Sequence, residues 1–111
     1  METNKYIVVL VMASSNDEAA TITRALLEQK KVACANIVKD VDSLFWWKGR
    51  IDTAKECLII MKTKQGAFGK VEKEVRKMHS YSVPEIIAMP VAAGSAGYLD
   101  WIDKSCILKG A

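Results

Sequence analysis

The sequence is poor in the residue types that usually build catalytic and metal centres. Its 111 residues include one histidine, His79, and three cysteines, Cys34, Cys57 and Cys106. The cysteines are an odd number at wide spacing without a Cys-x-x-Cys pair, which argues against a disulfide framework and a structural zinc site. Reduced thiols of this kind predict a cytoplasmic location. A single histidine rarely forms a catalytic centre by itself.

Long apolar runs and a large excess of one charge are also absent. The apolar run at residues 6–12 is too short to span a membrane, and no signal-peptide cleavage pattern follows it, so we expect no membrane association. The net charge of +3 comes from 16 basic and 13 acidic residues that are scattered along the chain. This distribution gives little support for nucleic acid as a partner.

The motifs of several enzyme classes are missing as well. The sequence contains no glycine-rich phosphate loop, no Gly-x-Ser-x-Gly and no His-Glu-x-x-His. We also find no pairing of a nucleophile with a base. The protein is therefore not expected to be an enzyme.

What the sequence does contain is an alternation of strand and helix patterns, within one expected domain of residues 1–111. The expected elements are strands at 6–12, 32–47, 50–62 and 85–89, and helices at about 16–30, 65–78 and 96–106. Ser15 with Glu18 forms a capping box for the first helix, and Ser95 is the expected cap of the last. The first strand is β-branched, so we expect it to be central and covered on both faces. The order βαββαβ plus a helix predicts an α+β, ferredoxin-like sandwich.

Four large apolar residues, Leu44, Phe45, Trp46 and Trp47, directly precede a glycine turn at residues 48–49. Successive side chains of a strand point to opposite faces, so both faces of this segment need cover. The hairpin arms, of roughly 12 to 14 residues, span about 40 Å, whereas a 15-residue helix covers only about 22 Å of the sheet. The tip must therefore extend past the helices. We interpret these four residues as a subunit interface; the alternative is that the C-terminal segment folds back over the tip.

Chemistry, if present, is expected near the lone histidine and the first cysteine. His79 could act as a metal ligand or base, with Tyr81 as a hydrogen-bond donor and Glu85 as a second ligand. The alternative is that His79 only ends a helix and that the following proline begins a strand. Cys34 is either a soft metal ligand or a small buried apolar residue, and Cys57 is too far along the hairpin to join it.

Taken together, these segments resemble the CutA divalent-cation tolerance family. The resemblance rests on ACANI at 33–37, FWWKGRI at 45–51, KT at 62–63, HSYSVPEI at 79–86 and YLDW at 98–101. It covers the chain from about residue 7 to 101. The resemblance implies a ferredoxin-like fold in a homotrimer similar in architecture to the PII signalling proteins, with long hairpins running between neighbouring subunits. It also implies divalent metal binding, copper in particular, and metal tolerance.

The chain departs from the family pattern at the proposed copper ligands. Some bacterial members have a cysteine at the end of the first strand and a His-His pair, which correspond here to Val11, Met78 and His79. Ser80 stands where proline is usual. Since one of the three ligands is kept, we expect only weak binding of Cu²⁺ or Zn²⁺.

Two functional hypotheses follow. In the first, a non-enzymatic trimer binds divalent cations, with His79 as the principal ligand and Glu85 and Cys34 contributing across subunits. In the second, a PII-like sensing module binds a small anion or metabolite in a cleft between subunits, lined by Trp47, Tyr81 and Glu85. A weaker third hypothesis is a scaffold whose trimer is itself the function.

Overall fold

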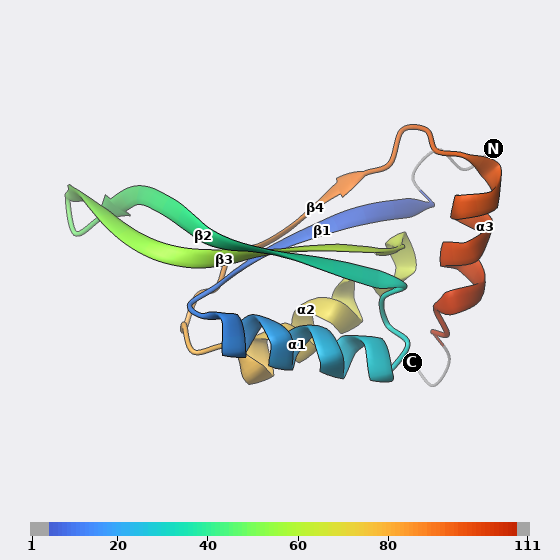
Figure 1. Ribbon diagram of the computed structural model, residues 1–111, viewed down its shortest axis with the longest axis horizontal. Coiled ribbons are helices and arrows are strands. Elements are labelled where there is room, and N and C mark those ends of the chain that lie inside the picture. Colours follow the sequence, from blue (N-terminus) through green and yellow to red (C-terminus); the bar gives the residue numbers. More distant parts are fainter. Residues whose placement is uncertain (1–4, 109–111) are drawn as a thin grey trace.

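The computed structural model describes residues 5–108, so both ends of the expected domain lie outside the described part. The elements are β1 (Tyr6–Ala13), α1 (Asn16–Glu28), β2 (Cys34–Trp47), β3 (Arg50–Lys64), the 3₁₀ turn η1 (Gln65–Ala67), α2 (Phe68–Met78), β4 (Ile86–Pro90) and α3 (Ala96–Ser105). Figure 1 shows the four strands as one sheet, with α1 and α2 on one side of it. The predicted order of strands and helices is confirmed.

The strands form an antiparallel sheet in the order β2-β3-β1-β4. β1 and β3 are therefore central, and β2 and β4 are the edges. Pro90 ends β4, where a missing backbone donor is tolerated because no further strand pairs there.

The core lies between the sheet and the two helices α1 and α2. Alternate residues of β1 are fully buried, as a period-two strand requires when one face is covered. The core includes Val9, Val11, Ile59 and Met61 from the sheet, Ile22 and Leu26 from α1, and Val71 and Val75 from α2. Burying side chains of this size contributes about 1.5–3 kcal/mol each. This packing fixes the strand ends from which the candidate site is built.

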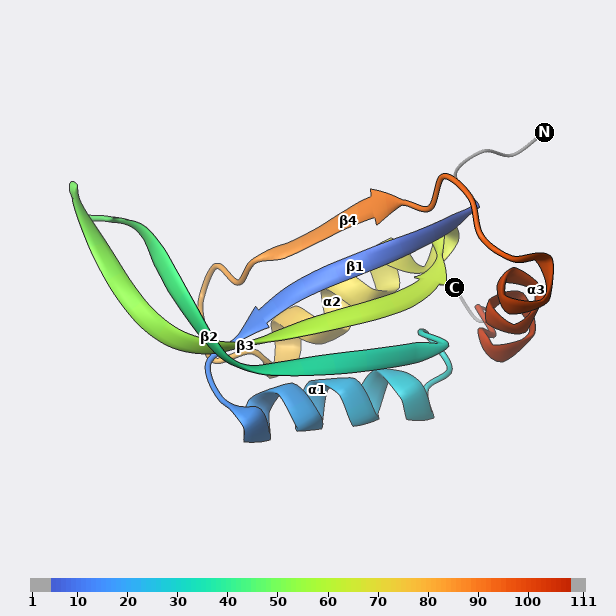
Figure 2. The same cartoon turned by 45° about the horizontal axis from the view of Figure 1, so that its top comes forward.

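The opposite face of the sheet is not covered, which corrects our expectation that β1 is covered on both sides. Both α1 and α2 lie on the same side of the sheet, so neither covers the second face (Figure 2). Helix α3 contacts that face at one end only, where the Tyr98 hydroxyl is 3.4 Å from the Cys34 sulfur. We call this the open sheet face; it comprises Val8, Leu10, Met12, Leu58, Ile60, Ile87 and Met89. Ile87 is 50% exposed and Met89 47% exposed. A single chain thus leaves a continuous apolar surface in contact with water.

Helix ends follow the sequence signals in part. The Ser15 hydroxyl accepts a hydrogen bond from the Glu18 backbone N–H at 3.1 Å, which confirms it as the N-cap of α1. Ser95 occupies the N-cap position of α3, as predicted, but its side chain makes no capping hydrogen bond to the described residues. The second predicted helix also begins later than expected, because residues 65–67 adopt a 3₁₀ turn before α2.

The β2–β3 hairpin extends well beyond the helices, as predicted, and the longest dimension of the molecule is 45 Å. Gly49 takes a φ of +78° in the turn, a conformation that glycine adopts without strain. A bulge shifts the register between Val38 and Val41, and Asp40 there has a φ of +57°. Figure 2 shows the hairpin curving away from the helices beyond this region. The C-terminal helix α3 lies at the opposite end of the molecule, so it does not cover the tip (Figure 1).

Candidate functional site

The curved hairpin and the segment before β4 enclose a groove of about 770 Å³. Its lining residues come from the end of β1, the hairpin and residues 81–85. They are Met12, Ser43, Leu44, Phe45, Trp47, Asp52, Glu56, Tyr81, Ser82, Val83 and Glu85. Three of the predicted site residues, Trp47, Tyr81 and Glu85, are therefore brought together here. We refer to this feature as the hairpin groove.

One side of the hairpin supplies aromatic rings to the groove. Residues directly opposite each other in an antiparallel pair share a face, and Phe45 pairs with Asp52 while Trp47 pairs with Arg50. Phe45, Trp47 and Asp52 all line the groove. Trp46 is not among the lining residues and is 74% exposed, although Leu44, on the same face of the strand, does line the groove.

The polar part of the groove is acidic. Among the described residues that line it there are three carboxylates, Asp52, Glu56 and Glu85, and no lysine, arginine or histidine. Glu56 is buried, and its Oε2 accepts a hydrogen bond from the Tyr81 hydroxyl at 2.8 Å. Partial burial, this hydrogen bond and the nearby carboxylate charges raise the pKa of Tyr81 to about 12. A surface of this charge attracts cations rather than anions.

His79 lies behind the groove and both of its ring nitrogens are bonded. Its Nε2 is 2.7 Å from the Met12 carbonyl oxygen, and its Nδ1 is 3.0 Å from the Tyr81 backbone nitrogen. A carbonyl only accepts and a backbone N–H only donates, so the ring is the neutral tautomer with its proton on Nε2. Its side chain has 0% exposure. A metal ion could reach either nitrogen only by displacing one of these hydrogen bonds.

Glu18 holds the same segment from the other side. Its carboxylate accepts hydrogen bonds from the Ser14 backbone N–H at 2.9 Å and from the Ser80 backbone N–H at 2.7 Å. Partial burial acts to raise the pKa of Glu18, but these hydrogen bonds outweigh it and lower the pKa to about 2. Glu18 and His79 together fix the backbone of residues 79–81, and so the direction in which Tyr81 enters the groove.

Cys34 lies apart from the other predicted ligands. It pairs with Lys62 in the sheet, whereas Met12, the partner of His79, pairs with Leu58. Four residues along a strand separate these positions by about 13 Å. Within residues 5–108 no group of three His, Cys, Asp or Glu side chains is placed to hold a metal ion. The predicted set of Cys34, His79 and Glu85 therefore does not form a metal site within one chain.

Sequence reasoning missed Asp52, Glu56 and Glu18. The bulge places Glu56 opposite Val41, and no sequence signal fixed that register. Glu18 was recognised only as part of a capping box, yet its carboxylate bonds to Ser80, 62 residues away. A search for acidic residues on the same hairpin face as Trp47 would have found Asp52.

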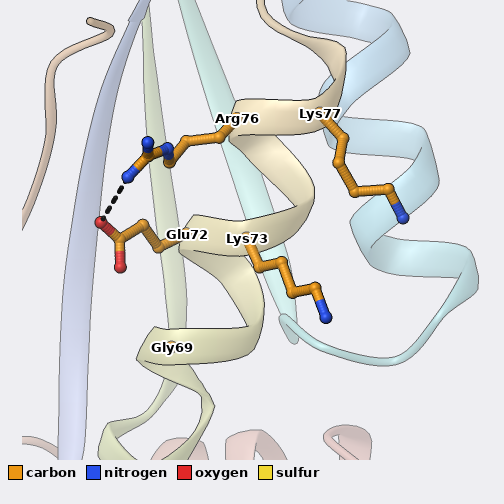
Figure 3. Close-up of a pocket in the computed structure, with 5 residues that line it drawn as sticks. All are labelled: Gly69, Glu72, Lys73, Arg76 and Lys77. Atoms are coloured by element: carbon orange, nitrogen blue, oxygen red, sulfur yellow. Dashed lines mark ion pairs between the residues drawn. The ribbon is translucent and has the colours of Figure 1, made fainter.

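A second depression, of about 380 Å³, lies on the surface of α2 and contains none of the predicted site residues. Figure 3 shows Lys73 and Lys77 extending from one side of the helix and Arg76 with Glu72 from the other. Arg76 and Glu72 form an ion pair at 3.8 Å. Charges of this kind on an exposed helix are mainly solvated, so we assign no ligand to this surface.

The fold and the groove define a class of small α+β proteins with one uncovered sheet face, and comparisons with known proteins specify the family. The CutA1 divalent ion tolerance protein family matches residues 7–105. The divalent-cation tolerance protein CutA of Thermus thermophilus is 42% identical over 98 residues, which cover 88% of this chain and 95% of the relative. The chain belongs to the CutA divalent-cation tolerance family.

Solved structures agree with this assignment. The periplasmic divalent cation tolerance protein CutA from Archaeoglobus fulgidus is 42% identical with a TM-score of 0.88, and the alignment covers 90% of this chain and 97% of that one. The CutA1 structure from Oryza sativa is 33% identical with a TM-score of 0.92, covering 96% and 98%. The similarity therefore includes the hairpin and α3 as well as the core.

Proposed function

We propose that this protein is a non-enzymatic homotrimer that acts in divalent-cation tolerance and binds Cu²⁺ or Zn²⁺ weakly between its subunits. The observation that carries the proposal is the open sheet face. Its apolar residues, such as Leu10 and Ile60, lie side by side on β1 and β3 and meet no helix. Contiguous apolar surfaces of this kind mark interaction sites.

The number of three copies comes from the family resemblance. The strand order and the open sheet face are compatible with such an assembly. The strand order β2-β3-β1-β4 agrees with the ferredoxin-like topology expected of PII-like trimers. Three copies related by a three-fold axis can turn their open sheet faces toward one another in a closed assembly. Light scattering should give three times the mass of one chain; a monomeric mass at micromolar concentration would contradict the proposal.

Metal binding then depends on donors from more than one copy. Glu85 is exposed at the mouth of the groove, and Cys34 is half-buried at the other end of the sheet. Within residues 5–108, neither has two further metal-ligating side chains nearby. We propose that Glu85 is the principal accessible donor, with Cys34 and, after release of its hydrogen bonds, His79 as contributors.

Calorimetric titration of Cu²⁺ and Zn²⁺ into the assembled protein tests this assignment. Glu85→Gln keeps the shape of the side chain and removes its charge, so we expect weaker binding, by about tenfold or more. Glu72→Gln, on the exposed side of α2, is the matched control and should bind as wild type does. Equal affinities of the wild type, Glu85→Gln, Cys34→Ser and His79→Gln would overturn the site.

A second candidate function, binding of a small molecule in PII-like fashion, is favoured by the hairpin groove. Its volume of about 770 Å³ lies in the range of small-molecule sites. Trp47 and Tyr81 provide aromatic surface, and the three carboxylates favour a cationic ligand over the anion that we also considered. A thermal-shift screen of metabolites discriminates between the two functions. Stabilisation by metals alone would count against this second candidate.

The cytoplasmic location stays a prediction. It rests on the three free cysteines, whereas a relative from rice is named as chloroplastic and the Archaeoglobus protein as periplasmic. None of the helices in residues 5–108 is long and apolar enough to cross a membrane.

A further inference from the structure

Two of the carboxylates in the hairpin groove are far apart on one strand. Asp52 and Glu56 both belong to β3 and both line the groove. They are four residues apart on the same face of the strand, which separates them by about 13 Å. Two carboxylates at this distance cannot hold one metal ion together, because metal–oxygen bonds are only about 2.0–2.6 Å long. This spacing favours an elongated cation over a point charge.

Glu56 lies at the end of the groove nearest to β1, since the next residue, Cys57, pairs with Ala13. It is 9% exposed, and its Oε2 accepts the hydrogen bond of the Tyr81 hydroxyl. The other oxygen, Oε1, has no hydrogen-bond or ion-pair partner within residues 5–108. Within the same range, Thr23 Oγ1 is the only fully enclosed side-chain oxygen or nitrogen that lacks a partner, so Oε1 is still accessible from the groove. A largely buried carboxylate with one unpaired oxygen favours the binding of a cation there.

An aromatic ring lies beside each of the two carboxylates. Asp52, at the end of the groove nearest to the hairpin turn, pairs with Phe45, and the Cβ atoms of such a pair are about 4.5–5.5 Å apart. At the other end, the Tyr81 hydroxyl is 2.8 Å from Glu56. An ammonium group at either end would therefore meet both a carboxylate and an aromatic ring, and each of these attracts it.

The rest of the groove suits a hydrocarbon chain. Its apolar lining residues are Met12, Leu44, Trp47 and Val83, on which methylene groups can pack. Lys48 and Arg50, at the hairpin turn, are not lining residues, although Lys48 Nζ lies 5.7 Å from the centroid of the Trp47 ring. The whole chain has a net charge of +3, so attraction of a cation is a property of the groove and not of the protein surface in general.

We propose that the hairpin groove binds a linear polyamine, with its terminal ammonium groups at Asp52 and Glu56 and its methylene chain on the apolar surface between them. This inference rests on the second candidate function and names the class of its ligand. Glu85 adds a third negative charge to the same groove. A small monoamine would use only one end of the site, whereas a linear polyamine uses both.

Calorimetric titration of spermidine into the full chain tests the two ends separately. Asp52→Asn and Glu56→Gln each remove one charge and keep the shape of the side chain, so each should weaken binding by about tenfold or more. Glu28→Gln removes the same charge from an exposed position of α1 and is the matched control, which should bind as wild type does. Circular dichroism checks the fold of each variant. Asp52 is exposed, so Asp52→Asn tests the site even if Glu56→Gln fails to fold.

Two diamines of equal charge test whether the ligand reaches both carboxylates. Diaminooctane is long enough to approach both ends of the groove, and diaminobutane is too short. The longer diamine should bind wild type at least about tenfold more tightly, and Asp52→Asn should remove most of this difference. Equal affinities of the two diamines for wild type would overturn the two-ended site.

The remaining outcomes separate this inference from the function on which it rests. If spermidine does not bind but another metabolite stabilises the protein in the thermal-shift screen, the polyamine is wrong and the small-molecule function stands. If no metabolite stabilises the protein, that function fails as well. Weakening of spermidine binding by Glu28→Gln as large as that by Asp52→Asn would show general attraction to the surface and would overturn the site.

Discussion

His79 and Met12 are joined by a hydrogen bond of 2.7 Å between the imidazole Nε2 and the backbone carbonyl oxygen, across 67 positions of the sequence. The bond joins the loop after α2 to the end of β1. The second ring nitrogen of His79, Nδ1, accepts a hydrogen bond from the Tyr81 backbone N–H. The only histidine of the chain is thus placed where it sets the shape of the groove from behind.

Replacement of this histidine should affect stability first. His79→Ala leaves the partly buried Met12 carbonyl without its partner and frees residues 79–81, so we expect a loss of about 2–4 kcal/mol in the free energy of unfolding. Urea denaturation at fixed protein concentration measures it. Ser82→Ala, at an exposed position in the same segment, is the control and should change stability by no more than about 0.5 kcal/mol. A similarly small loss for His79→Ala would contradict the role given to these bonds.

Acid should weaken the fold through Glu18. Its pKa is about 2 in the folded protein, below the ordinary value of 4.5, so its contribution is complete above pH 4.5 and is lost as the pH falls toward 2. We expect about 1–2 kcal/mol to disappear over this interval, since the group is partly solvated. Glu18→Gln should lower stability at neutral pH and flatten the profile between pH 4.5 and 2. An unchanged profile in that variant would assign the acid sensitivity to other groups.

Alkaline titration should report on the groove. The pKa of Tyr81 is about 12 because of partial burial and its bond to Glu56, so its ionisation should lag behind that of an ordinary phenol. The linked contribution to stability is present below pH 10 and is lost as the pH rises toward 12. Glu56→Gln should move the pKa back toward 10. Ultraviolet absorbance follows the phenolate, and Tyr81→Phe identifies its share among the three tyrosines. A Glu56→Gln titration identical to wild type would refute this coupling.

A charge on the open sheet face should prevent assembly. Leu10 lies between Ile60 and Ile87 on this face and is only partly buried in a single chain. Leu10→Asp should therefore destabilise the monomer less than a charge at fully buried Val9 or Val11 would, and circular dichroism checks that it still folds. In the proposed trimer the same carboxylate is buried without a partner, which costs several kcal/mol. Light scattering should show monomers. Ala20→Glu, on the solvent side of α1, is the control, and a trimeric Leu10→Asp would remove the open sheet face from the interface.

Most of the fold could be predicted because its signals are local. Alternating or continuous apolar runs predicted the positions of the strands. The Ser15 cap predicted where α1 begins, and Gly49 predicted the hairpin turn. The uncovered face of β1 could not be predicted in this way. A central strand has a continuous apolar sequence when both of its faces are buried. The sequence is the same whether helices of the same chain or another protein surface cover the second face.

The candidate site was less predictable, because its contacts are long-range. Tyr81 and Glu85 were identified from their motif, and the alternation of the strand placed Trp47 on the other face from Trp46. Glu56 accepts the hydrogen bond of Tyr81, and its position on the sheet depends on the register shift between Val38 and Val41, which the sequence did not predict. The bonding of both His79 nitrogens, which leaves neither free for a metal, required the loop and the end of β1 in three dimensions.

The bulge in β2 has a further consequence for how safely the chain folds. β2 is an edge strand of 14 residues, and an uninterrupted edge of that length can recruit strands from other chains into fibrils. Lys39 and Asp40 interrupt the pairing and put two charges at the break, with Asp40 in a left-handed conformation. The exposed edge is thereby divided into two short stretches, 34–38 and 41–47, which meet at a bend. The kink beside the groove thus also leaves a shorter, charged edge that is less able to pair with strands of other chains.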